Sequence, residues 1–522
     1  MDRRTLLALL LSGLVLIVWF ALFPPPRPVP PTPTPTEAQP SAAPATRGAE
    51  AAPVAEAAAA PAVNAVAERA AEAVEITLEG ERWRAVVDSA GATIDSIVLS
   101  GYRDDEKAPL EMVAPGTGGL LAMTAAGPWN QEPYVVERSG AVVTLRWSDG
   151  RGNWVEKRIA AASGPYGLQV EVSAGGAPAV GGVVIADGGI GGAKAVARAA
   201  QGGAVVRLDG SLERLNPAKL DGGRDLRGRI EFAGVEDQYF VVVLLPEGGL
   251  DEVRVDNRAQ TGQPIARVAA HAGNGRVRGT LYAGPKDHDI LTGLGRGLDE
   301  TLSFGFFGFL SVAFLAVLRW IYSWSANWGV AIIVLTAAIR LVLFPLTHKS
   351  TVAMKRMQTL QPKMKAIQDR YQERAKKDPQ VRARMNQELM QLYKQEKVNP
   401  MGGCLPIVAQ MPILFALYTL FANAIELRHA PFMLWIHDLS LKDPTYITPI
   451  LMTASMVLQQ KLSPQVGDPA QRRMFMLMPF IFGLMFMSFP AGLVLYWLVN
   501  NILTIAQQLA TERLLRAKPA TT

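Results

Sequence analysis

The sequence predicts a multi-domain membrane protein with an N-terminal transmembrane anchor, an exported all-β domain and a C-terminal α-helical membrane bundle. Three observations carry this prediction. The chain has 522 residues, which is long enough for several domains. Its composition changes from Pro and Ala at 24–70, to that of a soluble domain at 75–300, to mostly apolar residues at 301–510. The net charge is +6, and a block of basic residues at 349–397 directly follows an apolar run, as juxtamembrane residues do.

Residues 1–23 are predicted to form an anchor whose N-terminus lies in the cytoplasm. Two arginines precede the apolar run Thr5–Phe23, which is long enough to span ~30 Å of hydrocarbon. A cleaved signal peptide is the alternative, but the run ends in three prolines and no small-x-small cleavage site follows it. Residues 24–73 are interpreted as a linker, because Pro–Thr repeats and Ala with scattered Pro bury too little apolar surface to become ordered.

Residues 74–302 are predicted to form an antiparallel β domain outside the membrane. Short segments such as Val142–Trp147 and Leu168–Val172 alternate apolar and polar residues, and clusters of Gly, Asp and Ser separate them. The range is long enough for a large β-sandwich. No repeat within it is regular enough to define smaller domains.

The apolar part contains six candidate membrane segments, at 304–324, 328–346, 404–424, 446–461, 474–489 and 491–509. If the first of them spans the membrane, the basic block at 349–397, with 13 Lys/Arg against 5 Asp/Glu, is exported, which contradicts the positive-inside rule. If residues 303–326 instead form an interfacial helix, every basic cluster becomes cytoplasmic. We therefore predict five spans within 327–510, or six with the anchor, and both termini in the cytoplasm, including the tail 511–522.

Residues 348–400 are predicted to form a cytoplasmic hairpin of two amphipathic helices. Apolar residues recur at steps of three and four residues at 354–371 and again at 381–392. Between these stripes, Asp378 can cap the second helix and Pro379 suits its first position. Pro362 is expected to kink the first helix or to delay its start.

Two interpretations of the hairpin surface are compatible with each other. In the simpler one, the apolar stripes bury each other and the basic residues are solvated. In the other, basic and Met side chains also contact anionic phospholipid, a ribosome or an emerging chain. The basic candidates for such contacts are Lys355, Arg356, Lys363 and Lys365.

Arg340 is the main functional candidate, because it is a lone charge in the interior of the five predicted spans. An Arg near the bilayer centre costs ~2.5–3.5 kcal/mol on insertion scales, so it normally faces water or a partner. No acidic residue lies within these spans, which favours water in a hydrophilic groove. The alternative is snorkelling, because the cytoplasmic end of the span is roughly 10 Å away. Thr336, Gln410 and Asn500 add polar groups at membrane depth, although interhelical hydrogen bonds would also explain them.

The sequence predicts no cofactor, metal site or catalytic centre. The single cysteine, Cys404, and the five histidines form no zinc-binding pattern. The sequence has no GxxxxGK[ST] motif, and its membrane part has no Ser/His/Asp arrangement, so neither nucleotide hydrolysis nor bond chemistry is expected. Because the basic residues lie beside the membrane, nucleic acid is not expected as a specific ligand.

Ordered motifs at 301–516 strongly resemble those of the YidC/Oxa family of membrane protein insertases. The matching segments are Asn327–Gly329, Arg340 with Phe344–Thr347, Leu360–Lys363, Lys397–Cys404, Gln410–Ile413, Phe432–Leu439 and Phe489–Tyr496. The large exported domain resembles that of the Gram-negative branch. The resemblance implies that this domain is a β-supersandwich and that residues 24–326 lie in the periplasm of a cell with an inner membrane.

The same resemblance implies an insertase and chaperone that binds nascent membrane proteins and works with the Sec translocon and, transiently, the ribosome. It implies that Arg340 is the groove arginine and that Thr336, Tyr496 and Trp497 line the substrate path. The sequence departs from the family at Trp497, where close relatives often carry Tyr. Trp keeps the aromatic surface but lacks the hydroxyl, so a role that needs a hydroxyl is not expected to transfer.

Two other functions remain open on the sequence. A solute transporter or channel would also place polar groups in the membrane, but transporters often carry internal repeats, and none is detectable here. An envelope-assembly scaffold would bind its ligand through the β domain and use the spans as an anchor. In a scaffold, replacing Arg340 with Ala would have no effect.

Overall fold

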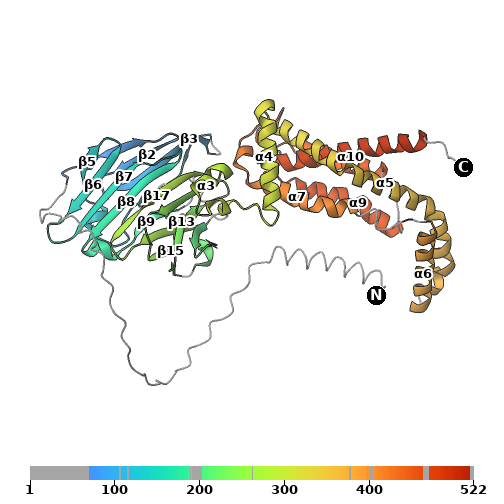
Figure 1. Ribbon diagram of the computed structural model, residues 1–522, viewed down its shortest axis with the longest axis horizontal. Helices are drawn as coiled ribbons and strands as arrows, with labels where there is room; N and C mark the ends of the chain where they lie inside the picture. The colour runs from blue at the N-terminus through green and yellow to red at the C-terminus, as the bar shows by residue number, and fades with distance from the viewer. Residues whose placement is uncertain are drawn as a thin grey trace, which may run out of the picture. The chain divides into compact units, whose positions relative to one another are not determined.

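The computed structural model describes residues 70–104, 107–113, 117–188, 190, 203–220, 222–260, 263–375, 378–396, 398, 405–462 and 469–517. The predicted anchor at 1–23 and almost all of the predicted linker at 24–73 lie outside these residues. The described chain forms a β part followed by a helical part (Figure 1). This order confirms the prediction of a β-rich domain followed by apolar helices.

The β part forms three antiparallel sheets. Its strands are β1 (Glu75–Glu79), β2 (Trp83–Asp88), β3 (Thr93–Arg103), β4 (Pro109–Glu111), β5 (Val135–Ser139), β6 (Val142–Ser148), β7 (Trp154–Ala161), β8 (Gly167–Gly175), β9 (Val183–Asp187), β10 (Gly203–Leu208), β11 (Ser211–Leu215), β12 (Arg224–Leu226), β13 (Ile230–Glu236), β14 (Phe240–Pro246), β15 (Glu252–Gln260), β16 (Gln263–His271) and β17 (Arg276–Pro285). The long sheet has the order β11-β10-β13-β14-β17-β8-β7-β6-β5, and the two short sheets have the orders β1-β2-β3-β4 and β12-β15-β16-β9. The predicted antiparallel pattern is therefore confirmed.

The two short sheets pack against the long sheet around one core. One short sheet lies over β7, and the other lies over β10, β13 and β14. The segment Leu120–Met123 links the short sheets, because Leu120 pairs with Ile94 of β3 and Met123 pairs with Val183 of β9. Strands such as β8 bury alternate residues, as expected where one face of a sheet covers a core. The interior strand β14 is buried along its whole length.

A buried lysine crosses this core. Lys157 of β7 is fully buried, and its Nζ donates to the carbonyl oxygens of Gly91 at 2.7 Å, Ala92 at 3.1 Å and Leu121 at 2.8 Å. Gly91 and Ala92 lie in the turn after β2, and Leu121 lies in the linking segment 120–123. One side chain of the long sheet therefore satisfies three backbone groups of the opposite layer.

The helical part begins directly after β17. Its helices are α3 (His288–Leu294), α4 (Gly308–Ser325), α5 (Trp328–Ala375), α6 (Pro379–Gln395), α7 (Leu405–Asn423), α8 (Ile447–Leu462), α9 (Pro469–Phe486) and α10 (Ala491–Ala517). Short 3-10 turns include η4 (Leu298–Thr301), after α3, and η6 (Ile425–Leu427), after α7. The bundle has its own core, in which α10 packs on α5 and α8, α8 packs on α9, and α4 packs on α5 and α7.

α5 is one helix of 48 residues, although the sequence suggested a span followed by a separate hairpin helix. It passes through Pro345 and Pro362 without ending, so a late start of the hairpin helix at Pro362, one of the two expected effects, is wrong. At 1.5 Å per residue, α5 is roughly 72 Å long. Each proline lacks an N–H and leaves the carbonyl four residues earlier without its usual helical partner. Figure 1 shows α5 leaving the bundle and turning alongside α6.

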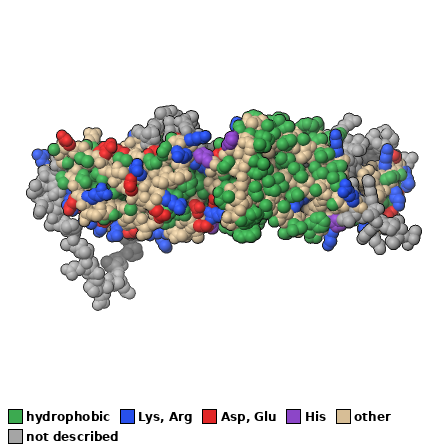
Figure 2. Space-filling model, turned by 90° about the horizontal axis from the view of Figure 1, so that it is seen from above, with side chains coloured by type: hydrophobic (Ala, Val, Ile, Leu, Met, Phe, Trp, Pro, Cys, Tyr) green, Lys and Arg blue, Asp and Glu red, His purple; other side chains and the backbone are tan. Residues whose placement is uncertain are grey.

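The outer surface of the bundle is apolar. Figure 2 shows hydrophobic side chains gathered over the bundle, whereas charged side chains are scattered over the β part. Among the described residues, α4, α10 and the segment 328–371 of α5 are long and apolar enough to cross a membrane, and α7 and α9 contain shorter apolar stretches. Length does not distinguish a span from an interfacial helix, so the interfacial position of α4 stays a prediction. Its exposed side chains include Phe309, Trp320 and Trp324.

Candidate functional site

Arg340 lies between α5 and α10. Its Nε donates to Oδ1 of Asn500 at 2.7 Å, and its Nη2 donates to the carbonyl oxygen of Asn500 at 3.3 Å and to the hydroxyl of Thr504. The next two residues, Leu341 and Val342, are about three-quarters exposed, whereas Arg340 is half-buried. The guanidinium is therefore turned into the bundle and its neighbours face outward. Among the described residues, no hydrogen-bond partner contacts Nη1 of Arg340, whose N–H groups remain available.

α10 presents a row of polar side chains toward α5 and α7. Tyr496, Asn500, Thr504, Gln507 and Thr511 follow steps of three and four residues, which places them on one helix face. The Gln507 amide donates to the Thr347 hydroxyl of α5 at 2.6 Å. The Thr511 hydroxyl lies 3.4 Å from Nδ1 of His348. Arg340 is therefore part of a polar seam between α5 and α10, defined by these α10 residues with Arg340, Thr347 and His348 of α5.

The other predicted groove residues divide into two groups. Gln410 of α7 donates through Nε2 to the buried Tyr496 hydroxyl at 2.5 Å, so it joins the seam. Thr336 lies one helical turn before Arg340, is buried, and donates to the carbonyl of Ile332 at 2.6 Å. Its hydroxyl is therefore satisfied within its own helix. Gln410 therefore contacts Tyr496, and Arg340 contacts Asn500 one turn further along the same face of α10, with Thr336 one turn before Arg340 on α5.

Trp497 lies outside the polar seam. Its ring is 5.0 Å from that of Phe486 and 6.4 Å from that of Phe482, both on α9. Trp497 follows Tyr496 by one residue, which turns it about 100° around the helix and toward α9. Trp497 packs against these two rings, and this packing needs an aromatic ring but no hydroxyl.

Several seam residues were not singled out in the sequence. Thr504, Thr347 and His348 were missed as candidates, because a single hydroxyl or imidazole within or just after an apolar segment is common and carries little signal alone. The spacing of Thr504 from Asn500 and Thr511 was the available signal. It becomes informative only once Arg340 is known to face α10.

The hairpin has the predicted apolar contacts. Ile367 packs with Met385 and Leu389, and Met357 packs with Leu360. Asp378 caps α6 by accepting from the backbone N–H of Gln380 at 2.8 Å, and Pro379 is the first residue of that helix. These features confirm the pattern of the two stripes and the cap.

The basic candidates of the hairpin lie mostly on its surface. Arg356, Lys363 and Lys365 are exposed, and Lys355 is half-buried. The ammonium of Lys363 lies 2.6 Å from a carboxylate oxygen of Glu396, near the end of α6. An exposed pair of this kind contributes little to stability.

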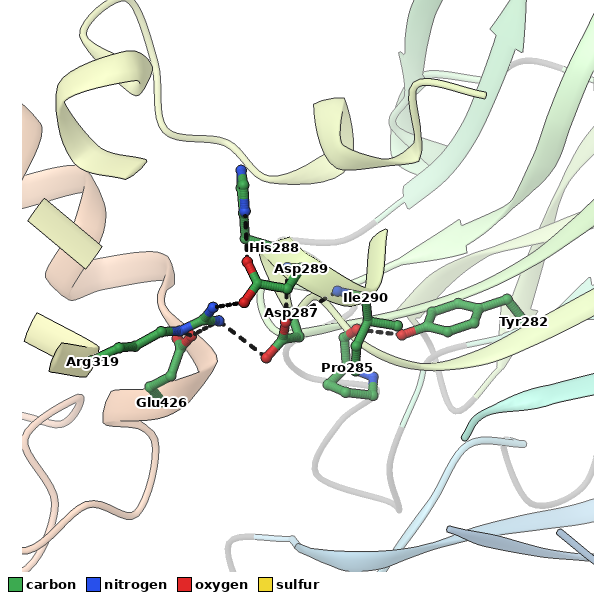
Figure 3. A network of polar contacts seen from close by, with 8 residues as sticks. All are labelled: Tyr282, Pro285, Asp287, His288, Asp289, Ile290, Arg319 and Glu426. Atoms are coloured by element: carbon green, nitrogen blue, oxygen red, sulfur yellow. Dashed lines mark hydrogen bonds and ion pairs between the residues drawn. The ribbon is translucent and has the colours of Figure 1, made fainter. Parts of the chain in front are cut away.

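A second polar cluster, which we call the Arg319 network, joins the β part to the bundle (Figure 3). Nε of Arg319, on α4, donates to Oε1 of Glu426 in η6 at 2.9 Å, and its Nη2 donates to Oδ2 of Asp287 at 3.1 Å. Its Nη1 contacts Asp289. Asp287 is also the N-cap of α3, because it accepts from the backbone N–H groups of Asp289 and Ile290. One guanidinium thus ties α3, α4 and η6 together.

Further contacts surround this network. Nε2 of Gln238 donates to the carbonyl oxygen of Ala422, near the end of α7, at 2.6 Å, and the Tyr239 hydroxyl donates to the same oxygen at 3.1 Å. The guanidinium of Arg428 lies 5.3 Å from the centre of the Phe240 ring, within cation–π distance. Burial raises the pKa of the Glu426 carboxyl, and Arg319 opposes that shift. Loss of Arg319 would therefore leave a poorly solvated acid.

The described residues contain no group of three or more His, Cys, Asp or Glu side chains that could hold a metal ion. The polar seam consists of one cation with amide, hydroxyl and imidazole groups. Such a set can bind acidic or polar peptide groups.

Comparison with known proteins gives two family matches. The model of the 60Kd inner membrane protein family matches residues 320–518, and the model of the YidC periplasmic domain matches residues 75–317. Together they cover the described β part and the bundle.

Individual relatives agree with these matches. The membrane protein insertase YidC of Geobacter metallireducens is 35% identical over 552 aligned positions, which cover 97% of this chain and 98% of that protein. The protein of the same name from Citrifermentans bemidjiense is 44% identical over 312 positions, which cover 58% of this chain and 55% of that protein. A crystal structure of an active YidC insertase with its first transmembrane domain resolved is 17% identical, covers 85% of this chain and 94% of that chain, and has a TM-score of 0.38.

Proposed function

This chain belongs to the YidC family of membrane protein insertases, and we propose that it inserts and folds integral membrane proteins in a bacterial inner membrane. Its substrates are nascent membrane proteins. It works through a hydrophilic groove at Arg340 that is open to the cytoplasm and to lipid. It needs no nucleotide hydrolysis, because it moves a substrate between environments and breaks no bond.

The contacts of Arg340 carry this proposal. A guanidinium turned into an apolar bundle, and held there by one amide, one carbonyl and one hydroxyl, keeps its positive charge without an acidic partner. Its Nη1 N–H groups, which donate to none of the described residues, and its positive charge attract the acidic residues of a substrate tail. Exposed apolar residues beside it, such as Leu341 and Val342, offer the adjoining lipid surface to the apolar segment of that substrate.

The proposed mechanism divides the crossing into two smaller steps. The hydrophilic tail of a short membrane protein first enters the groove, so it crosses less than the full ~30 Å of hydrocarbon. The apolar segment then moves sideways into lipid, where it gains ~0.8 kcal/mol for each CH₂ group removed from water. This gain releases the tail on the outer side. Gln410, Tyr496 and Asn500 supply neutral hydrogen-bond partners along the path, with Thr336 beside them.

The proposed topology places both termini in the cytoplasm and residues 24–326 in the periplasm. The hairpin is then cytoplasmic, where its exposed Arg356, Lys363 and Lys365 meet the ribosome or anionic phospholipid. Substrates reach the groove either alone or together with the Sec translocon.

The test is depletion of this protein in its host, followed by complementation with variants. Insertion of a newly made single-span protein with an acidic tail is measured by protease protection. Uninserted substrate accumulates on depletion and disappears when the wild-type chain is supplied.

Arg340→Ala lowers insertion by about tenfold or more, because the groove loses its charge. A tenfold loss corresponds to about 1.4 kcal/mol. Arg340→Lys retains more activity than Arg340→Ala, because charge matters more here than the shape of the guanidinium.

Lys349→Ala is the matched control. Lys349 is an exposed basic residue of the same helix, outside the polar seam, and its loss should leave insertion unchanged. Equal loss of insertion in Arg340→Lys and Arg340→Ala would reject the electrostatic account. Full insertion activity of the Arg340→Ala variant would indicate that the protein is an envelope-assembly scaffold and not an insertase that uses this charge.

A further inference from the structure

A groove lies between α8 and α9, on the outer surface of the bundle and apart from the polar seam. It has a volume of about 630 Å³, within the usual range of ligand sites. Ile450, Ala454, Val457 and Lys461 line one side at steps of four, three and four residues, which places them on one face of α8. From Ile450 to Lys461 this face extends about 16 Å.

The groove exists because α9 approaches α8 closely at a glycine. A Cβ atom added to Gly483 would lie 2.2 Å from the Thr453 hydroxyl, so only a residue without a side chain fits there. Phe480 and Leu484 on either side are 57% and 69% exposed and form the opposite wall. Gly483 therefore forms the bottom of the groove, and the side chains of α8 and α9 form its two walls.

The lining of the groove is apolar except at one end. The Thr453 hydroxyl donates to the carbonyl of Pro449 at 2.8 Å, so the helix itself satisfies it. Lys461 is exposed and lies at the end of the groove, in the last turn of α8. The described lining of the groove therefore combines a long apolar channel with one cation, Lys461, at its mouth.

Size distinguishes the possible occupants. An α-helix of the same 16 Å length and ~10 Å diameter occupies about 1,300 Å³, roughly twice the volume of the groove. A single acyl chain is thinner, and it extends about 15 Å, which is half of the ~30 Å hydrocarbon layer. The groove matches an acyl chain in length, and its volume is too small to enclose a helix.

We propose that this groove is a specific site for an anionic phospholipid, with one acyl chain between α8 and α9 and the phosphate on Lys461. The choice of the inner leaflet rests on the topology of the proposed function. Lipid tails surround the whole bundle, so the apolar channel alone gives little selectivity. The ammonium of Lys461 supplies it, because anionic headgroups attract basic residues at a membrane surface.

The experiment uses the full chain, purified in detergent and given limiting phosphatidylglycerol or phosphatidylcholine. Native mass spectrometry measures the ratio of lipid-bound to lipid-free chain. The wild-type chain should retain phosphatidylglycerol about fivefold better than phosphatidylcholine. Lys461→Gln should remove that preference. Ala454→Phe fills the groove and should reduce retention of both lipids.

Two controls match these variants. Arg513→Gln removes an exposed basic residue of α10, and Ala506→Phe enlarges an exposed alanine of α10. Both lie outside the groove and should bind lipid as the wild type does. Arg340→Ala should also retain lipid normally, which separates failure of this proposal from failure of the insertase proposal.

Three results would overturn the lipid site. One is equal retention of the two lipids by the wild-type chain. Another is an equal loss in the control and groove variants. The third is displacement of the retained lipid by a hydrophobic helical peptide at equimolar concentration, which would identify a substrate helix as the occupant.

Discussion

Arg340 and Lys157 are both basic residues held inside apolar surroundings, and the chain satisfies their N–H groups in different ways. Arg340 uses the amide, carbonyl and hydroxyl groups of a neighbouring helix and keeps Nη1 N–H groups available. Lys157 is fully enclosed, and its three partners are backbone carbonyls. The first arrangement suits a residue that meets a substrate. The second suits a residue that holds two layers of a sandwich together.

Lys157 should make the stability of the β part depend on pH. Burial lowers the pKa of Lys157 to about 7, from 10.5. Between these two values the unfolded chain binds a proton that the folded chain does not, so the free energy of unfolding rises with pH. From pH 7 to pH 9.5 we expect the wild-type β part to gain about 2–4 kcal/mol. Pulse proteolysis of the full chain in urea measures this gain.

Lys157→Met provides the control for this dependence. Met has no titratable group, so the pH-dependent gain should be lost, and the three unpaired carbonyls should lower stability at both pH values. A parallel rise of the wild type and the variant with pH would show that other groups cause the effect.

At the scale of elements, the Arg319 network links parts of the chain that are far apart in sequence. α3 closes the β part, α4 leads into the bundle, and η6 follows α7. A single guanidinium on α4 holds carboxylates from the other two. The position of α7 is therefore coupled to the β part, and α7 also carries Gln410 of the polar seam.

Arg319→Met should destabilise the chain by about 2–4 kcal/mol, because it leaves the buried Glu426 carboxylate without its partner. The double variant Arg319→Met with Glu426→Gln should recover at least half of that loss. Thermal unfolding of the full chain in detergent measures both. The exposed pair Arg84–Glu79 is the control, and Arg84→Met should change stability by less than about 0.5 kcal/mol. A double variant as unstable as the single one would reject a charge-based role.

The sequence predicted local features well and long-range contacts poorly. Helical spacing and the Asp378 cap predicted the hairpin, because these signals lie within a few residues of each other. The continuous α5 was missed, because Pro362 usually ends or kinks a helix and only packing shows that this one continues. The partners of Lys157 and Arg319 lie up to 107 residues away along the chain, so no local pattern contains them. Arg340 was found because an isolated charge among apolar residues is itself a local signal.

At the scale of the whole molecule, the proposed topology places the hairpin and the loop before α8 on opposite sides of the membrane. In a Cys404→Ser background, a cysteine at Lys365 should react with a membrane-impermeant maleimide only when the cytoplasmic side is opened. A cysteine at the exposed Lys442 should react from the periplasm in intact cells. Reaction of the cysteine at position 365 in intact cells, and therefore from the periplasm, would reject the arrangement of five C-terminal spans with an interfacial α4.

The β part should be largely dispensable for insertion, provided that the Arg319 network survives. Deletion of 75–285 keeps Asp287 and Asp289 as partners of Arg319 and should support insertion in depleted cells. Deletion of 75–302 removes these carboxylates together with α3 and η4, and should insert substrate less well. Protease protection of the same single-span substrate compares the two. Equal activity of both deletions would show that the network does not support the bundle.

The unbroken course of α5 has a mechanical consequence. The helix carries Arg340 in its bundle part and the first arm of the hairpin at its far end, and it turns between them. Its backbone hydrogen bonding is interrupted at Pro345 and Pro362, where a long helix bends most easily. A displacement of the hairpin would therefore reach Arg340 only through these two prolines, which set how much of it is absorbed on the way.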